Sequence, residues 1–181
     1  MFKEIEEFFK ERYEGWEGVA QFEGLSRRFE RLIEEMCWPI SKVKGEVDGC
    51  FQAVFEDSYD EMLVCKDVSV WTLCPHHLLP CLFKVNIGYI PLGKVLGLSK
   101  FARVAVALGK TPIMQEQYTR DLADTFWNEL KPEGLGVYVT GRHGCMGCRG
   151  VNQDIDVVTS TLRGSFMELG VREEFYAICR G

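Results

Sequence analysis

The three histidines of the chain lie in two short segments, and both segments also carry cysteine. The first segment is residues 74–77 (CPHH) and the second is residues 143–148 (HGCMGC). Thiolate and imidazole are preferred zinc ligands, and Cys74 and His77, three positions apart, converge on one ion if the chain turns between them. Pro75 favours such a turn because it interrupts the preceding strand. The two segments together predict a metal site.

Two kinds of zinc site fit this spacing. A closed structural site would have four ligands, namely Cys74, His77, Cys145 and Cys148. A catalytic site would use the first three and leave a coordination position for water. The pairing of C-x2-H with C-x2-C is typical of structural zinc, so Cys148 is the residue that decides between the two. A third interpretation, that these side chains only fill the core, fits a lone cysteine or histidine better than a doubled cluster.

The closed site would leave His76 and His143 without a role. Imidazole is the side chain best suited to acid and base catalysis near neutral pH, which favours the catalytic alternative. His143 and Cys145 are two positions apart and therefore share one face of a strand. One of them can bind the metal while the other acts on a substrate.

Composition limits the partners of this site. The 181 residues carry a net charge of -6 with no block of Lys or Arg, so we expect no nucleic-acid partner. The apolar runs are too short to span a bilayer, and the first residues lack a secretory signal, so we expect a cytoplasmic protein with no membrane partner. The eight cysteines are then expected as thiols.

Periodicity predicts an α+β fold in which an antiparallel sheet carries helices on one face. Residues 1–48 are expected to form an N-terminal helical region and residues 49–181 a single catalytic domain. Helices are predicted over 2–13, 26–37, 99–108, 114–130 and 172–180. A hairpin is predicted within 49–73, with a turn at residues 57–60, and further strands over 82–90, 136–142 and 155–166.

Several short runs of this chain occur in the same order in one known family. They are Asp60-Glu61-Met62, residues 74–80 (CPHHLLP), Tyr89-Ile90-Pro91, Gly97-Leu98-Ser99-Lys100, Gln115-Glu116, Cys145-Met146 and Arg149-Gly150. By these runs, the chain resembles the GTP cyclohydrolase I family from about residue 24 onward. The resemblance implies a tunnelling fold (T-fold) whose sheets join between subunits into β-barrels, in a homodecamer with active sites at subunit interfaces. It also implies hydrolysis of GTP to formate and 7,8-dihydroneopterin triphosphate, which leads to folate and tetrahydrofolate and so to one-carbon metabolism.

The resemblance assigns the metal site as well. It implies that Zn2+ is held by Cys74, His77 and Cys145, and that His76 and His143 are the acid and base. Two departures bear on this assignment. Pro75 stands where the family usually has an acidic residue, and Cys148 is an additional thiol.

Substrate contacts are also implied. Lys100 and Arg103 share a face at the start of a helix that Ser99 can cap, and a helix N-terminus favours the phosphates of GTP. By the resemblance, Arg149 joins these phosphate ligands and a neighbouring subunit donates Arg31.

The resemblance implies that Glu116, which follows Gln115, reads the N1-H and amino group of guanine. Two other functions remain open at this stage. One is a structural-zinc interaction module, and the other is a purine-handling relative of the same fold, such as an NADPH-dependent nitrile reductase with a cysteine nucleophile. The doubled His/Cys cluster favours the metal enzyme over the reductase.

Overall fold

The computed structural model describes residues 2–181. The helices are α1 (Lys3–Arg12), η1 (Val19–Phe22), α2 (Leu25–Met36), α3 (Ile40–Cys50), α4 (Leu98–Gly109), α5 (Gln115–Leu130), α6 (Gly144–Gly147), η2 (Ser165–Met167) and α7 (Leu169–Arg180). The strands are β1 (Val54–Glu56), β2 (Leu63–Leu73), β3 (Pro80–Ile90), β4 (Lys94–Leu96), β5 (Gly134–His143) and β6 (Val157–Gly164). None of the helices in the described residues is long and apolar enough to cross a membrane.

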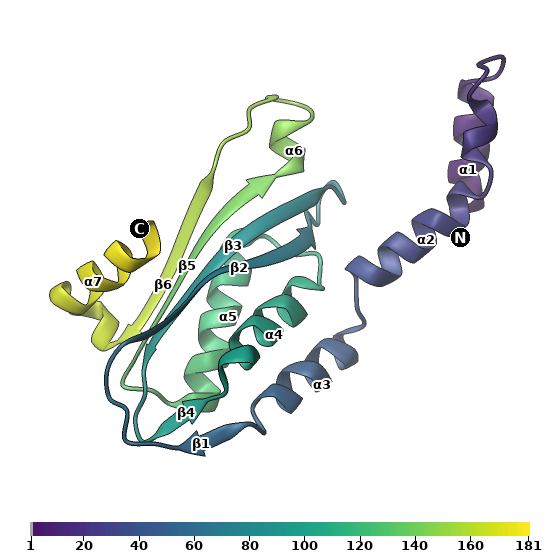
Figure 1. Cartoon of the computed structure of the whole chain (residues 1–181). Coiled ribbons are helices and arrows are strands. Elements are labelled where there is room, and N and C mark those ends of the chain that lie inside the picture. Colours follow the sequence, from purple (N-terminus) through teal and green to yellow (C-terminus); the bar gives the residue numbers. More distant parts are fainter. Residues whose placement is uncertain (1) are drawn as a thin grey trace.

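Four strands form the main sheet, in the order β2-β3-β5-β6, and all neighbours are antiparallel. β3 and β5 pair along ten consecutive positions, from Cys81 opposite His143 to Ile90 opposite Gly134. β1 and β4 form a separate two-stranded ribbon at the end of the sheet opposite α6 (Figure 1). Chemistry at the α6 end therefore depends on how β2, β3 and β5 terminate.

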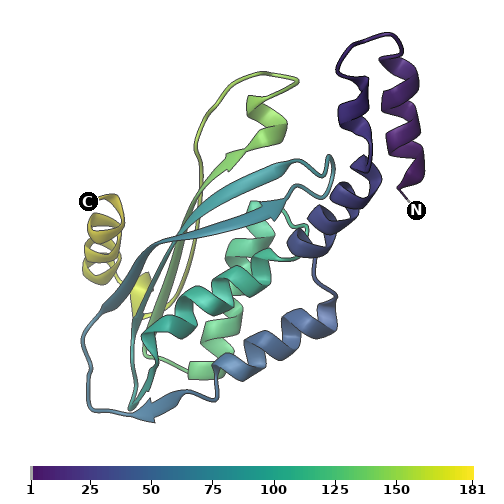
Figure 2. The same cartoon turned by 45° about the vertical axis from the view of Figure 1, so that its right-hand side comes forward.

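The core lies between the sheet and helices α4 and α5, which cover one face of it (Figures 1 and 2). Alternate residues of β3 point into this core and are fully buried, as the period of two along a strand requires. The ring of Phe83 lies 5.2 Å from that of Tyr118 on α5, and Tyr89 lies 5.1 Å from Phe101 on α4. The predicted α+β fold with an antiparallel sheet is thus confirmed.

The opposite face is partly covered by α7, a placement that the sequence analysis did not assign. Phe166 and Phe175 are fully buried there, with their ring centroids 5.1 Å apart. They lie directly over two strand glycines, Gly88 and Gly136, because a Cβ atom at either position would overlap the aromatic rings. These glycines are what allow the C-terminal segment to approach the sheet.

The N-terminal helices differ in how they pack. α1, η1 and α2 contain no buried residue and extend away from the sheet (Figure 1). α3, by contrast, contributes Val43, Val47 and Cys50 to the core. The predicted boundary after residue 48 falls within the last turn of α3, and the division into two regions stays a prediction.

Two local predictions were wrong. The segment 49–73 does not form a hairpin, because β1 pairs with β4 and β2 pairs with β3. Pairing with the 11-residue β3 satisfies far more of the backbone of β2 than the three-residue β1 can. Helix α3 was missed, since Gly45 and Gly49 weaken its helical signal; the helix is stabilised by burial of its apolar side. The other predicted helices and strands are present, with ends shifted by a few residues.

The packing over Gly136 predicts a stability change. A Cβ at this position would lie 2.5 Å from Phe166 and 2.8 Å from Phe175, so Gly136→Ala should destabilise the fold by about 1–3 kcal/mol through overpacking. Gly45→Ala is the matched control. It lies in a helix with nothing within 4 Å, and should stabilise by about 0.5–1 kcal/mol. Urea unfolding measures both, and a Gly136→Ala midpoint at or above wild type would contradict this packing.

Candidate functional site

The turn between β2 and β3 places the first histidine segment. Cys74 follows the last residue of β2, and its N–H donates to the carbonyl oxygen of Leu79 at 2.9 Å, while the N–H of Leu78 donates to the Cys74 carbonyl at 2.8 Å. Leu78 takes up a positive φ of 52° to close the turn. Because the turn is tight, the His77 Nδ1 comes within 3.5 Å of the Cys74 Sγ.

The second segment approaches from β5. His143 is the last residue of that strand, and the short helix α6 follows it and carries Cys145. α6 packs closely on the start of β3, where a Cβ at Gly144 would lie 2.8 Å from the backbone oxygen of Pro80. Glycine at 144 therefore lets Cys145 reach the turn that holds Cys74.

One ligand atom from each of Cys74, His77 and Cys145 lies within 4.8 Å of the others, so this group could hold a metal ion. A tetrahedral zinc with usual bond lengths would separate its thiolate and imidazole ligands by about 3.6 Å, which matches the Cys74–His77 distance. Within residues 2–181, no such group includes Cys148. The Cys148 thiol instead donates to the Gly144 carbonyl at 2.8 Å. The structure thus brings together a three-ligand set.

The thiol of Cys145 is held in its protonated form by its surroundings. Burial and the neighbouring Cys74 thiol raise the pKa of Cys145, and the charge of Arg149 opposes this shift. Thiolate is the form that binds metal, so metal binding at this site has to release a proton.

Both ring nitrogens of His143 are hydrogen-bonded inside the protein. Nε2 lies 2.8 Å from Oε1 of Gln115, and Nδ1 lies 3.3 Å from the thiol of Cys81. Gly141, two residues earlier on the same face of β5, leaves room for this glutamine, because a Cβ there would overlap its Oε1. Burial lowers the pKa of His143, and the negative charge of Glu116 partly offsets that effect. His143 is therefore neutral at pH 7.

These side chains surround a small cavity of about 150 Å³. Its wall includes Cys74, His76, Glu116, His143 and Cys145. His76 is exposed, with its Nδ1 4.0 Å from the Cys74 Sγ, and Glu116 is exposed in the first turn of α5. The cavity thus combines side chains able to bind a metal ion, two imidazoles and the carboxylate of Glu116.

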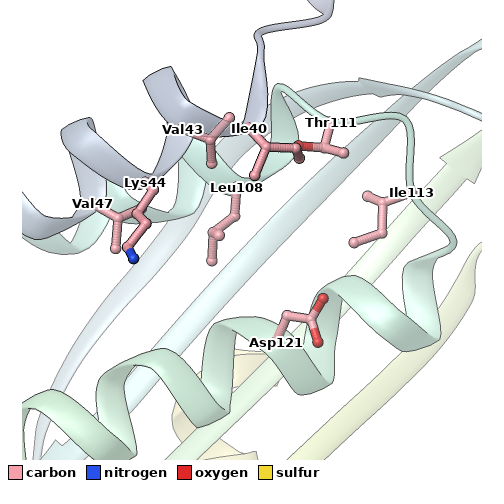
Figure 3. Close-up of a pocket in the computed structure, with 8 residues that line it drawn as sticks. All are labelled: Ile40, Val43, Lys44, Val47, Leu108, Thr111, Ile113 and Asp121. Carbon is pink, nitrogen blue, oxygen red and sulfur yellow. The ribbon is translucent and has the colours of Figure 1, made fainter.

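A larger cavity of about 320 Å³ lies between α3, α4 and α5 (Figure 3). Its lining is mainly apolar, with Lys44 and Asp121 as the charged side chains, and it contains neither histidine nor cysteine. Ile113 borders both cavities. Chemistry, rather than volume, therefore identifies the smaller cavity as the candidate site.

Three of the predicted phosphate ligands lie at the other end of the sheet. Ser99, Lys100 and Arg103 are in the first turns of α4, and the neighbouring Phe101 packs on Tyr89. The strand spacing from Cys81 to Tyr89 corresponds to about 26 Å. One chain therefore does not bring these residues to the metal ligands.

The predicted cap of α4 was wrong. The helix begins one residue earlier than predicted, with Gly97 as its N-cap and no side-chain capping hydrogen bond. Ser99 lies inside the first turn and is exposed. The loop before α4 is already fixed by a backbone hydrogen bond from Gly97 to Ala53, which leaves the Ser99 hydroxyl without a capping role.

The remaining predicted substrate-binding residues also lie in different places, two near the candidate site and one away from it. Arg149 is exposed just after α6 and is close enough for its charge to act on Cys145. Gln115 lies behind His143, and only 1% of it is exposed. Arg31 is exposed on α2, the helix that extends away from the sheet.

Sequence reasoning missed Cys81 as a member of this cluster. The strand pairing reveals its membership, because Cys81 on β3 lies directly opposite His143 on β5. Pairing register is a tertiary property, and local periodicity alone does not supply it.

A family model and the curated relatives that match this chain carry the same description. A sequence model of the family described as GTP cyclohydrolase I matches residues 5–180. "GTP cyclohydrolase 1" of Pelotomaculum thermopropionicum is 37% identical over 161 residues, covering 87% of this chain and 84% of its own. The protein of the same description from Synechococcus sp. (strain JA-2-3B'a(2-13)) is 37% identical over 163 residues, covering 88% and 71%. Among solved structures, the apo archaeosine synthase QueF-Like has a TM-score of 0.43 at 20% identity, covering 59% of this chain and 96% of its own.

The ligand geometry predicts how metal content responds to cysteine replacement. Cys145→Ala removes one of three ligands and should reduce bound metal from about one ion per chain to a small fraction of that. Cys148→Ala removes a thiol of the same segment that lies outside the group, and should leave metal content unchanged. Elemental analysis of the purified proteins measures both. Loss of metal in Cys148→Ala, or full retention in Cys145→Ala, would contradict the ligand set.

Proposed function

Since the chain belongs to the GTP cyclohydrolase I family, we propose that it converts GTP and water to formate and 7,8-dihydroneopterin triphosphate with the aid of Zn2+. The observation that supports this most is the three-ligand group of Cys74, His77 and Cys145 beside the carboxylate of Glu116 and two imidazoles. Three protein ligands are the usual number at catalytic zinc, since the fourth position is left for water. Bound zinc would supply a Lewis acid that lowers the pKa of water toward neutrality.

Glu116 is the group we propose for recognition of the base. Guanine presents its N1-H and amino group side by side, and one carboxylate accepts both hydrogen bonds, whereas adenine offers no such pair. The carboxylate of Glu116 makes no hydrogen bond or ion pair among those the structure shows in residues 2–181, so it is available to a ligand. It also borders the cavity that contains the metal ligands.

The two imidazoles would move the protons. Ring opening and loss of formate require proton transfer to nitrogens of the guanine imidazole ring, and the later ribose rearrangement requires transfer at the sugar oxygen. Neutral His143 next to the metal ligands can accept a proton, which suits the first step. His76 is exposed at the cavity wall, and we assign it to the second step.

The triphosphate would be bound by two copies of the chain. Arg149 lies near Cys145, but Ser99, Lys100 and Arg103 lie at the far end of the sheet. We therefore propose that a neighbouring copy supplies these three residues, and that Arg31 on the extended helix α2 comes from a neighbour as well. This requires a homo-oligomer, for which we propose the T-fold decamer, in which sheets join into β-barrels.

The alternatives have less support. A structural-zinc module would need Cys148 as the fourth ligand, and this thiol is engaged with Gly144. A nitrile reductase would need NADPH and a nucleophilic cysteine, whereas Cys74 and Cys145 are within metal-binding distance of His77. We propose a cytoplasmic enzyme at the entry to pterin and folate biosynthesis.

The reaction is tested directly with zinc-loaded protein and GTP. Formate and, after oxidation, a fluorescent pterin should appear in equal amounts, because each ring opening releases one formate. ATP serves as the control substrate and should yield neither product, because it lacks the groups that Glu116 recognises. Absence of formate from GTP in protein that retains its metal would refute the proposed function.

The assignment of Glu116 is tested by Glu116→Gln. The amide keeps the size of the side chain but replaces one acceptor oxygen with a donor, so the KM for GTP should rise by roughly tenfold to a hundredfold. Metal content should not change. Glu129→Gln, an exposed position near the other end of α5, makes the same charge change and should leave KM unaltered. Equal KM values for the two variants would remove Glu116 from base recognition.

A further inference from the structure

The hydrogen bonds of Gln115 fix the orientation of its side-chain amide. Nε2 of Gln115 donates to the backbone oxygens of Val157 at 2.8 Å and Val139 at 3.2 Å, and it lies 3.1 Å from the hydroxyl of Thr159. A carbonyl oxygen only accepts, so a reversed amide would place Oε1 against two other acceptors. The amide oxygen must therefore be the atom that faces His143.

This orientation determines the tautomer of His143. Oε1 of Gln115 lies 2.8 Å from the His143 Nε2 and can only accept, so Nε2 carries the hydrogen. A neutral imidazole has one N–H. Nδ1 of His143 is consequently the nitrogen with the lone pair, and it is the basic atom of this side chain.

Cys81 is the hydrogen-bond partner of the His143 nitrogen that carries the lone pair, Nδ1. Cys81 and His143 are directly opposite each other on β3 and β5, and the thiol lies 3.3 Å from Nδ1. The side chain is buried, and its thiol lies closer to Nδ1 of His143, at 3.3 Å, than to the backbone oxygen of Leu79, at 3.9 Å, so the thiol hydrogen is donated to Nδ1. Cys81 lines the same cavity as Cys74 and Cys145, which places it beside two of the proposed metal ligands.

Building on the proposed function, we propose that Cys81 and Gln115 are positioning residues for His143. Gln115 keeps the proton on Nε2, and Cys81 keeps Nδ1 beside the metal-ligand cluster, so that Nδ1 is the atom that accepts a proton during turnover. The proton comes from an O–H of the hydrated guanine ring and passes from Nδ1 to a nitrogen of that ring as the ring opens, which returns His143 to its neutral form. A thiol suits this position because it is a weak donor that releases Nδ1 easily.

The tautomer is measured by nitrogen NMR on the zinc-loaded full chain labelled with 15N-histidine. The chain has three histidines, and the signals of His143 are those that disappear in His143→Gln. We expect a protonated Nε2 and an unprotonated Nδ1 at a pH where the ring is neutral. A hydrogen on Nδ1 would overturn the proposal. No GTP is present, so the result is independent of whether the protein turns over GTP.

Substitutions at both positions provide the second test. Gln115→Met removes the acceptor for Nε2 and should produce a mixture of tautomers, whereas Gln117→Met, at an exposed site on the same helix, should not. Cys81→Ala should lower kcat by about tenfold or more with KM for GTP and metal content unchanged, and Cys81→Ser should recover part of the loss because a hydroxyl still donates.

Cys65→Ala, which removes a half-buried thiol near the other end of β2, is the matched control and should retain wild-type kcat. A kcat for Cys81→Ala within twofold of wild type would contradict a positioning role for Cys81. If Gln115→Met fails to fold, the wild-type tautomer and the Cys81 variants still decide the question. Loss of GTP turnover in wild type with the expected tautomer present would refute the function and leave the hydrogen-bond assignment intact.

Discussion

The pairing register of three strands is the constraint on which this site depends. β3 lies between β2 and β5, and its first residues face Leu73 on one side and His143 on the other. The turn after β2 and the helix after β5 therefore meet at one end of the sheet, which brings Cys74 and His77 to Cys145. A shift of either pairing by one residue would displace the turn after β2 from α6, so the proposed metal site and the sheet are specified together.

At the same end of the sheet, several polar groups have a defined hydrogen-bond partner. The glutamine behind His143 is satisfied by backbone oxygens, and this fixes the imidazole that it contacts. The thiol of Cys148 is engaged with a backbone carbonyl, which keeps it away from the ligand set. Burial keeps His143 neutral and Cys145 protonated. Binding of a divalent ion would therefore change the charge of the site more than the gain or loss of a proton by any one residue. The arrangement fits the proposed binding of one ion and the proposed proton transfer beside it.

Much of the fold and of the candidate site could be predicted from the sequence. The parts that could not be predicted depend on contacts between residues that are distant in sequence. The CPHH and HGCMGC segments carry their ligands at short spacing, so the cluster around Cys74, His77 and Cys145 could be predicted locally. The partner of β2 could not, because strand pairing is decided by contacts distant in sequence, and a hairpin was wrongly expected. Cys81 was missed for the same reason. The position of Lys100 at the far end of the sheet follows from the direction of α4, which periodicity does not reveal.

The proposed catalysis depends on a metal site with three protein ligands and one position open to solvent. X-ray absorption at the zinc edge of the metal-loaded protein counts the sulfur atoms bound to the ion directly. We expect two sulfurs from Cys74 and Cys145, one imidazole nitrogen from His77, and one further light atom. A third sulfur, from Cys148 or from Cys81, would mean a closed site and would contradict the catalytic role.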